Sequence, residues 1–122
     1  MKSIAIIGAS NHREKFSNKC VRAYTKLGWK VFPVNPKEAE IEGIKCYASI
    51  KNVPQKTDLV SIYIPSQVTM GIIPELKGAK VAEVVLNPGA ESDELIAELK
   101  KNGIKPLMIC SIKMQGLSPD DF

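Results

Sequence analysis

The residues whose types and spacing suggest chemistry lie first in a loop between Gly8 and Lys15. This loop follows a short apolar run and precedes a segment with helical spacing, which is the setting of a nucleotide-binding glycine loop. Against the pattern Gly-x-Gly-x-x-Gly only Gly8 matches, because Ser10 and Arg13 stand at the second and third glycine positions. Those two glycines normally let a pyrophosphate approach the backbone and let the helix pack closely on the sheet. We therefore expect a different phosphate loop, with Arg13 and Lys15 as its candidate cations.

A second signal comes at the end of the next expected strand, where the sequence reads Val34-Asn35-Pro36-Lys37. Folds that bind NAD usually carry an aspartate or glutamate there, which accepts a hydrogen bond from the ribose 2′-OH. In this chain the first acid is Glu38, and it comes after Lys37. A cation at this corner favours a ribose that carries an extra phosphate, as in NADP or coenzyme A (CoA). Plain NAD is therefore disfavoured.

Candidate catalytic side chains are few. The single histidine, His12, lacks an orienting partner, and we expect it to be solvated. Cys20 falls on the apolar stripe of an expected helix and is predicted to be in the core. Cys110 follows the last expected strand, at the edge where ligands bind, and is either a small buried hydrophobe or a thiol within reach of a ligand. Because there is no Tyr-x-x-x-Lys pattern and no paired acid, we expect no catalysis by this chain alone.

Alternating strands and helices must position these loops. The pattern predicts strands at 3–7, 30–34, 58–64, 81–86 and 104–109, a short element at 44–47, a helical turn at 49–53, and helices at 17–27, 68–77 and 91–101. Ser17 is the expected N-cap of the first helix, and Gly28 its C-terminal left-handed residue. The order predicts an α/β fold, a Rossmann-like doubly wound sheet of about five parallel strands with helices on both faces in a single domain. Ligands of such folds bind beyond the carboxyl ends of the strands, where the strand order reverses.

Length and composition fit one globular domain, with 122 residues of which 44% are hydrophobic and 25% charged. We expect the domain to span residues 1–113 and residues 114–122 to form a C-terminal tail. Because residues 110–122 show no clear periodicity, we expect part of this segment to be disordered.

Several classes of protein and partner are excluded. No apolar run approaches the ~18–20 residues that span a bilayer, and the N-terminal run is too short for a signal peptide. Three widely spaced cysteines fit a reduced, cytoplasmic protein and form no zinc pattern. The net charge of +4 is modest for a duplex binder, and seven basic residues but one acid lie within residues 1–30. We therefore expect a local anionic ligand, and neither nucleic acid nor membrane as a partner.

Several short stretches together resemble a known family, the small stand-alone CoA-binding proteins. Their domain is similar to the N-terminal Rossmann domain of the succinate–CoA ligase alpha subunit. The resemblance covers roughly residues 3 to 113, and its order and spacing are more specific than any one motif. The matching stretches are Ile4-Ala5-Ile6-Ile7-Gly8-Ala9-Ser10, Lys15-Phe16-Ser17-Asn18-Lys19, Val31-Phe32-Pro33-Val34-Asn35-Pro36, Gly43-Ile44-Lys45-Cys46-Tyr47-Ala48-Ser49, Asn87-Pro88-Gly89-Ala90-Glu91-Ser92 and Cys110-Ser111-Ile112.

The resemblance implies a binding site for CoA or acyl-CoA. The adenosine diphosphate portion would lie against the first loop and the corner at residues 34–37, and the pantetheine arm would pass the ends of the third and fourth main strands. Carried over by position, the cofactor-binding residues are Gly8, Ala9, Ser10, Asn11, Arg13, Lys15, Phe16, Ser17, Val34, Asn35, Pro36, Lys37, Tyr63, Ile64, Pro65, Asn87 and Gly89.

The resemblance also implies what the chain lacks. The ligase alpha subunit continues into a second domain with a phosphorylated histidine, whereas this chain ends before such a domain, and His12 matches no catalytic position. We therefore expect a CoA-binding module that is non-catalytic on its own, with its protein partner and oligomeric state left open. Two alternatives remain: a small NADP-binding oxidoreductase domain, and a redox or regulatory protein in which Cys110 forms a mixed disulfide with CoA.

Overall fold

The main sheet has five parallel strands in the order β2-β1-β5-β6-β7, and the computed structural model describes all residues 1–122. The strands are β1 (Ser3–Ile7), β2 (Lys30–Val34), β5 (Leu59–Ile62), β6 (Glu83–Leu86) and β7 (Lys105–Met108). The helices are α1 (Phe16–Lys26), α2 (Ser66–Gly78) and α3 (Asp93–Lys101), and short 3-10 turns occur at Ile50–Asn52, Lys113–Gln115 and Pro119–Asp121. The predicted doubly wound α/β fold is confirmed.

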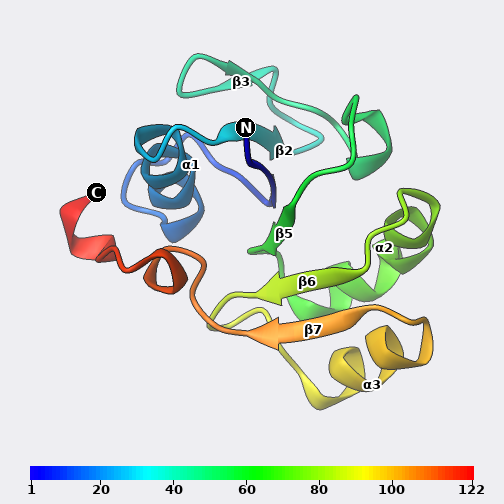
Figure 1. Ribbon diagram of the computed structural model, residues 1–122. Coiled ribbons are helices and arrows are strands. Elements are labelled where there is room, and N and C mark those ends of the chain that lie inside the picture. The colour runs from blue at the N-terminus through cyan, green and yellow to red at the C-terminus, as the bar shows by residue number, and fades with distance from the viewer.

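Two apolar cores lie on opposite faces of the sheet because side chains alternate along each strand. On β1, Ile4 and Ile6 belong to the core under α1, whereas Ala5 and Ile7 belong to the core under α2 and α3. Figure 1 shows α1 with the C-terminal turns on one side of the sheet and α2 with α3 on the other. Both faces of the sheet are therefore covered by helices or turns.

The helix ends follow the local sequence in two cases and depart from it in one. In α3 the Ser92 hydroxyl accepts a hydrogen bond from the Leu95 N–H (3.1 Å) and so caps the helix, and Gly28 after α1 has the expected positive φ of 83°. The prediction that Ser17 caps α1 is wrong. The helix begins at Phe16, Lys15 occupies the N-cap position without a side-chain bond, and Ser17 is buried in the first turn.

A small antiparallel hairpin joins β2 to β5, formed by β3 (Glu40–Ile41) and β4 (Ile44–Lys45). The sequence predicts only an element at 44–47, so the partner strand was missed. Ile41 is fully buried and anchors the hairpin in the core beside α1. The hairpin therefore stands next to the first loop. It brings Glu40 and Glu42, together with Glu38 just before it, close to that loop.

The C-terminal segment packs on the α1 face, although the sequence predicts partial disorder there. Pro119 and Ile112 are buried, Phe122 packs against the core beside α1, and its ring lies under the Lys26 ammonium (5.7 Å). Apolar contacts with α1, not local periodicity, fix this path. The longest helix, α2, has 13 residues, and no helix has the length and apolar character of a membrane span.

Candidate functional site

The site lies where β1 and β5 end side by side. The chain leaves β1 for α1 on one face and leaves β5 for α2 on the other, so the strand order reverses between them. Gly8, directly after β1, has a φ of 88°, and a Cβ atom there would lie 2.8 Å from Cγ2 of Ile64 after β5. Glycine is therefore required both by the backbone conformation and by the close approach of the two strand ends.

One hollow, which we call the β2 hollow, lies on the α2 side of Gly8 and has a volume of about 580 Å³. Its walls are the ends of β1 and β2, the 3-10 turn at Ile50–Asn52 and the start of α2. The Ser49 hydroxyl donates a hydrogen bond to the Glu75 carboxylate within this wall. The lining residues are Ile7, Gly8, Val34, Asn35, Pro36, Ala48, Ser49, Ile50, Lys51, Asn52, Ile64, Val68, Ile72 and Glu75.

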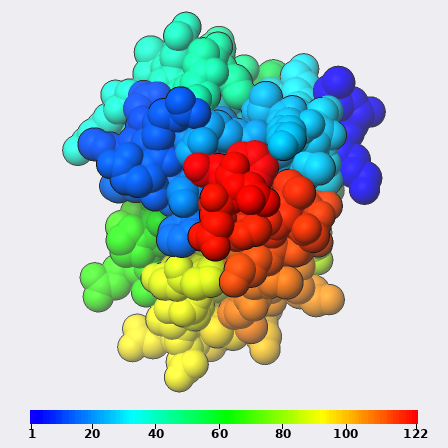
Figure 2. Space-filling model, turned by 90° about the vertical axis from the view of Figure 1, so that its left-hand side faces the viewer, coloured from blue at the N-terminus to red at the C-terminus, as the bar shows by residue number.

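A second hollow, the tail hollow, shares Gly8 and has a volume of about 750 Å³. Figure 2 looks onto this part of the molecule and shows the C-terminal tail (red) between α1 with the first loop (blue) and the segment after β6 (yellow). The lining residues are Gly8, Lys15, Phe16, Ser17, Tyr63, Asn87, Pro88, Cys110, Lys113, Ser118, Pro119 and Asp120. A third hollow of about 540 Å³, around Asp58 and Gly78, lies at the opposite edge and contains none of the predicted site residues.

The tail hollow is electropositive on its α1 side. The N–H groups of the first turn of α1 have no intrahelical partners, and no side chain caps them. The helix dipole adds partial positive charge at this point, and Lys15 and Lys113 line the same hollow. Asp120 is the single acid in the lining. The arrangement suits a ligand with phosphate groups at the start of α1.

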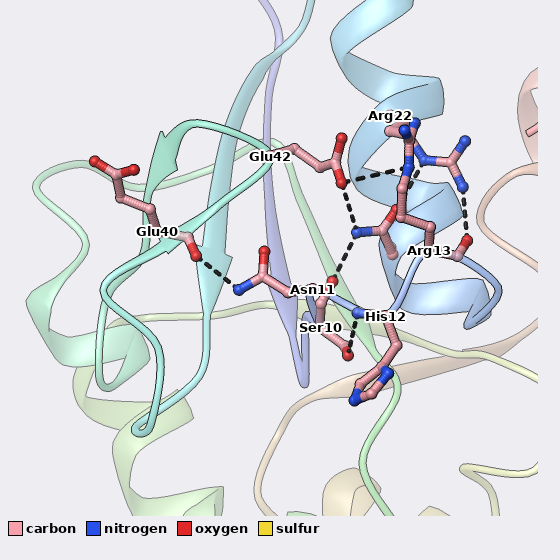
Figure 3. A network of polar contacts seen from close by, with 8 residues as sticks. Ser10, Asn11, His12, Arg13, Arg22, Glu40 and Glu42 are labelled. Atoms are coloured by element: carbon pink, nitrogen blue, oxygen red, sulfur yellow. Dashed lines mark hydrogen bonds and ion pairs between the residues drawn. The ribbon is translucent and has the colours of Figure 1, made fainter.

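Acids of the hairpin engage the first loop. Arg13 forms an ion pair with Glu42 (Nε to Oε2, 3.7 Å), and Asn11 donates hydrogen bonds to Oε2 of Glu38 (2.9 Å) and to the carbonyl of Glu40 (3.0 Å). Figure 3 shows these side chains facing the hairpin. His12 is exposed at the tip of the loop. Arg13 is thus held by a carboxylate, whereas Lys15 lines the tail hollow.

The structure brings ten of the predicted binding residues to the two hollows and leaves seven outside them. Those in the lining are Gly8, Lys15, Phe16, Ser17, Val34, Asn35, Pro36, Tyr63, Ile64 and Asn87. Those outside are Ala9, Ser10, Asn11, Arg13, Lys37, Pro65 and Gly89.

Backbone bonding explains why the start of the loop contributes little. The N–H groups of Gly8 and Ala9 both donate to the carbonyl of Val34 (2.9 and 3.3 Å), so neither is free for a ligand. Sequence reasoning missed the wall at 48–52 and the C-terminal residues Lys113, Ser118 and Asp120. No local signal could have found them, because only the tertiary fold brings them to the strand ends.

A buried polar cluster supports the floor of the tail hollow. The Asn87 side chain donates to Oγ of Ser61 (2.8 Å) and accepts from the N–H of Ser111 (2.8 Å), and the two serine hydroxyls are bonded to each other (2.6 Å). The Tyr24 hydroxyl donates to the carbonyl of Ser111 (2.6 Å). This cluster joins the end of β6 to β5, α1 and the tail.

The titratable groups near this cluster differ in exposure. Burial raises the pKa of the Cys20 thiol to about 12, so this thiol is protonated at neutral pH. Burial also raises the pKa of Tyr63, whose hydroxyl is buried without a hydrogen-bond partner. Cys110, in contrast, is half-buried and lines the tail hollow. No group of three or more His, Cys, Asp or Glu side chains is placed to hold a metal ion.

Comparisons with known proteins point in one direction. A family model described as a CoA binding domain matches residues 2–116. The ADP-forming acetate–CoA ligase of Methanocaldococcus jannaschii is 38% identical over 86 residues, which cover 69% of this chain and 12% of the ligase. The chain therefore spans only a small part of this relative.

Solved structures are similar over nearly the whole chain. A conserved hypothetical protein from Pyrococcus furiosus has a TM-score of 0.85 and 32% identity, covering 95% of this chain and 99% of that one. The dinucleotide-forming acetyl-coenzyme A synthetase 1 of Candidatus Korarchaeum cryptofilum, in complex with phosphate and ADP, has a TM-score of 0.78 and 29% identity. That match covers 91% of this chain and 26% of the synthetase.

Proposed function

The chain belongs to the CoA-binding domain family, and from this premise we propose that it binds coenzyme A, free or acylated, as a module whose own residues perform no catalysis. The observation that carries the proposal is the pair of hollows that meet at Gly8, one of them cationic at the start of α1. A ligand with two arms joined by a diphosphate fits this layout. The hollows have the size usual for cofactor sites.

In the proposed complex the adenosine lies in the β2 hollow, between Val34 and Pro36. The diphosphate crosses Gly8, where the missing side chain leaves room, and meets the first turn of α1 and Lys15. The pantetheine arm enters the tail hollow and passes Tyr63 and Asn87. Because tail residues line this hollow, the proposed binding unit includes them as well as residues 1–113.

The corner after β2 supports CoA over the nicotinamide cofactors. Lys37 is exposed there and its N–H donates to Oδ1 of Asn35 (2.8 Å), which sets the turn. The Lys37 side chain lies outside the β2 hollow, at the position proposed for the 3′-phosphate of the ribose. Asn35 stands where an NAD-binding fold would carry an acid.

The groups around the hollows support a binding role without chemistry. The single histidine is exposed on the loop, and the Tyr63 hydroxyl is buried with a raised pKa, which makes it a poor proton donor or acceptor at neutral pH. Catalysis on the bound thioester would then fall to a separate protein or domain. The three free cysteines support a reducing compartment such as the cytoplasm.

Calorimetric titration of the purified protein tests the proposal. We expect CoA to bind at micromolar concentration, dephospho-CoA about tenfold more weakly because it lacks the phosphate that meets Lys37, and NAD not at all. Clear NADP binding with no CoA binding below millimolar concentration would sink the proposal. Equal affinities for CoA and dephospho-CoA would remove Lys37 from the site.

Thiol labelling tests the position of the pantetheine arm. With iodoacetamide at pH 8 we expect Cys110 to react first and Cys20 not to react in the folded protein, because Cys20 is fully buried and its raised pKa of about 12 leaves little thiolate. Saturating acetyl-CoA, whose thiol is blocked and cannot consume the reagent, should slow the labelling of Cys110 by about tenfold or more, which peptide mass spectrometry measures. Undiminished labelling of Cys110 in the acetyl-CoA complex would place the arm elsewhere.

A further inference from the structure

Asn18 is fully buried in the first turn of α1, and its side-chain amide is bonded on both sides. Its nitrogen donates to the carbonyl of Ser10 (2.8 Å) and to Oε2 of Glu42 (3.1 Å). Its oxygen accepts from Nε of Arg22 (2.7 Å). Only this orientation of the amide supplies a donor to the carbonyl and the carboxylate and an acceptor to the guanidinium.

The same pattern extends along the first loop, where four carbonyl groups accept hydrogen bonds from other groups of the protein. The pairs are Asn35 Nδ2 with the carbonyl of Ala9 (2.8 Å), Asn18 Nδ2 with Ser10 (2.8 Å), the N–H of Lys15 with His12 (3.1 Å) and Nη2 of Arg22 with Arg13 (2.7 Å). Two of the four donors therefore depend on Asn18, one directly and one through Arg22.

Carbonyl oxygens carry partial negative charge and repel a phosphate, whereas N–H groups attract it. A loop beside an anion site must therefore keep its carbonyls turned away from the ligand. We propose that Asn18 is a positioning residue that, with Arg22, holds the carbonyls of Ser10 and Arg13 against α1 and away from the bound diphosphate. This inference rests on the proposed binding of CoA, and the buried side chain of Asn18 acts through the loop and not by contact with the ligand.

The hairpin contacts the same groups through Glu42, from the side opposite α1. Glu42 accepts from Asn18 and pairs with Arg13 through the same carboxylate oxygen, so one acid holds both the helix and the loop. Figure 3 shows the Glu42 carboxylate pointing from the hairpin toward α1, with Arg13 and Arg22 on the α1 side of it. The ion pair with Arg13 also keeps the negative charge of Glu42 from acting on the ligand uncompensated.

The test compares Asn18→Leu with the wild type and with Asn102→Leu. Leucine has a similar size and no charge, so it removes the bonds of Asn18 without adding a charge near the phosphates. Asn102 is half-buried and also makes side-chain hydrogen bonds, to the carbonyl and Oε1 of Glu98 (2.8 and 3.3 Å), but it lies at the end of α3, away from both hollows. We expect Asn18→Leu to weaken CoA binding about ten- to hundredfold and Asn102→Leu to leave it unchanged.

Pantetheine, which carries no phosphate, separates positioning from general damage. Its affinity, followed by NMR shifts at millimolar concentration, should be the same in Asn18→Leu and in the wild type. Equal losses for CoA and pantetheine, or CoA affinity within twofold of the wild type, would overturn the inference. If Asn18→Leu does not fold, Asn18→Ala replaces it, since alanine also removes the side-chain bonds to Ser10, Arg22 and Glu42 without adding a charge, and the same outcomes apply. Failure of the wild type to bind CoA would instead count against the proposed function.

Discussion

We expect Gly8→Ala to weaken CoA binding by at least about a hundredfold, which corresponds to about 2.7 kcal/mol. The new methyl group would lie 2.8 Å from Cγ2 of Ile64, 3.3 Å from its N atom and 3.4 Å from the carbonyl carbon of Tyr63. Because two of these neighbours are backbone, β1 and β5 would have to separate where the two hollows meet. The methyl group would also stand on the path proposed for the diphosphate.

The folded state is also affected, in two separable ways. A residue other than glycine at a φ of 88° carries a strain of roughly 1–2 kcal/mol, and the clash adds roughly 1–3 kcal/mol. Gly103→Ala is the matched control, because Gly103 has a φ of 75° but nothing within 4 Å of its would-be Cβ. In urea unfolding, Gly103→Ala should lower the free energy of unfolding by the backbone strain alone. It should bind CoA as tightly as the wild type.

If Gly8→Ala binds CoA as Gly103→Ala does, the diphosphate does not cross this position. Titration calorimetry at a temperature where both variants are folded makes the comparison independent of their stabilities. Circular dichroism confirms that condition before each titration.

The strands and helices could be predicted because their signals are local. Apolar runs of four to six residues between turn residues mark the parallel strands, and the acids of α3 and its Ser92 cap lie in consecutive positions. The importance of Gly8 was visible for the same reason, since a glycine directly after a buried strand marks the first turn of a doubly wound fold.

The hairpin and the fate of Arg13 could not be predicted because both depend on distant contacts. The turn of the hairpin is Glu42-Gly43, with φ of 52° and 76°, and glutamate is not among the residues that announce such a turn. Without the hairpin, the partner of Arg13 is invisible, since Glu42 lies far along the chain. The sequence therefore indicated a free cation where the structure holds an ion pair.

The structure therefore places the positive groups of the candidate site mainly at the start of α1 and not at Arg13 in the first loop. Arg13 is paired with Glu42 of the hairpin, and Asn11 is bonded to Glu38 just before it. Lys15, Lys113 and the uncapped first turn of α1, in contrast, face the tail hollow. Of the two cations that suggested a local anion site, Lys15 lines the hollow and Arg13 is held in an ion pair, while Lys113 and the start of α1 are additional positive groups. The segment 110–122, where the sequence predicts partial disorder, supplies one of the cations, Lys113.

The largest loss of stability away from Gly8 is expected for Asn87→Leu. Asn87 is 1% exposed, and its side chain accepts from the N–H of Ser111 (2.8 Å) while donating to Oγ of Ser61 (2.8 Å) and to the carbonyl of Ile62 (2.9 Å). Leucine would leave the Ser111 N–H buried without a partner and would remove a donor from Ser61. We expect the free energy of unfolding to fall by about 2 to 4 kcal/mol.

The position of Ser111 extends this effect to the ligand site. Ser111 lies in the C-terminal segment that lines the tail hollow, and Asn87 bonds it to the end of β6 and supports the direct bond between Ser111 and Ser61 of β5. Loss of the link should release the tail from the strand ends, so CoA binding should weaken together with stability. Amide hydrogen exchange should then increase in residues 111–122 of the variant before it increases in β1.

Asn102→Leu again serves as the control, because its bonds are confined to one turn at the end of α3. We expect it to lower the free energy of unfolding by about 1 kcal/mol or less, with the same dependence on urea as the wild type. Equal destabilisation by the two substitutions would mean that the buried cluster adds nothing beyond an ordinary surface hydrogen bond. Unchanged exchange in the tail of Asn87→Leu would show that the apolar contacts of Ile112 and Phe122 with the α1 face suffice to hold it.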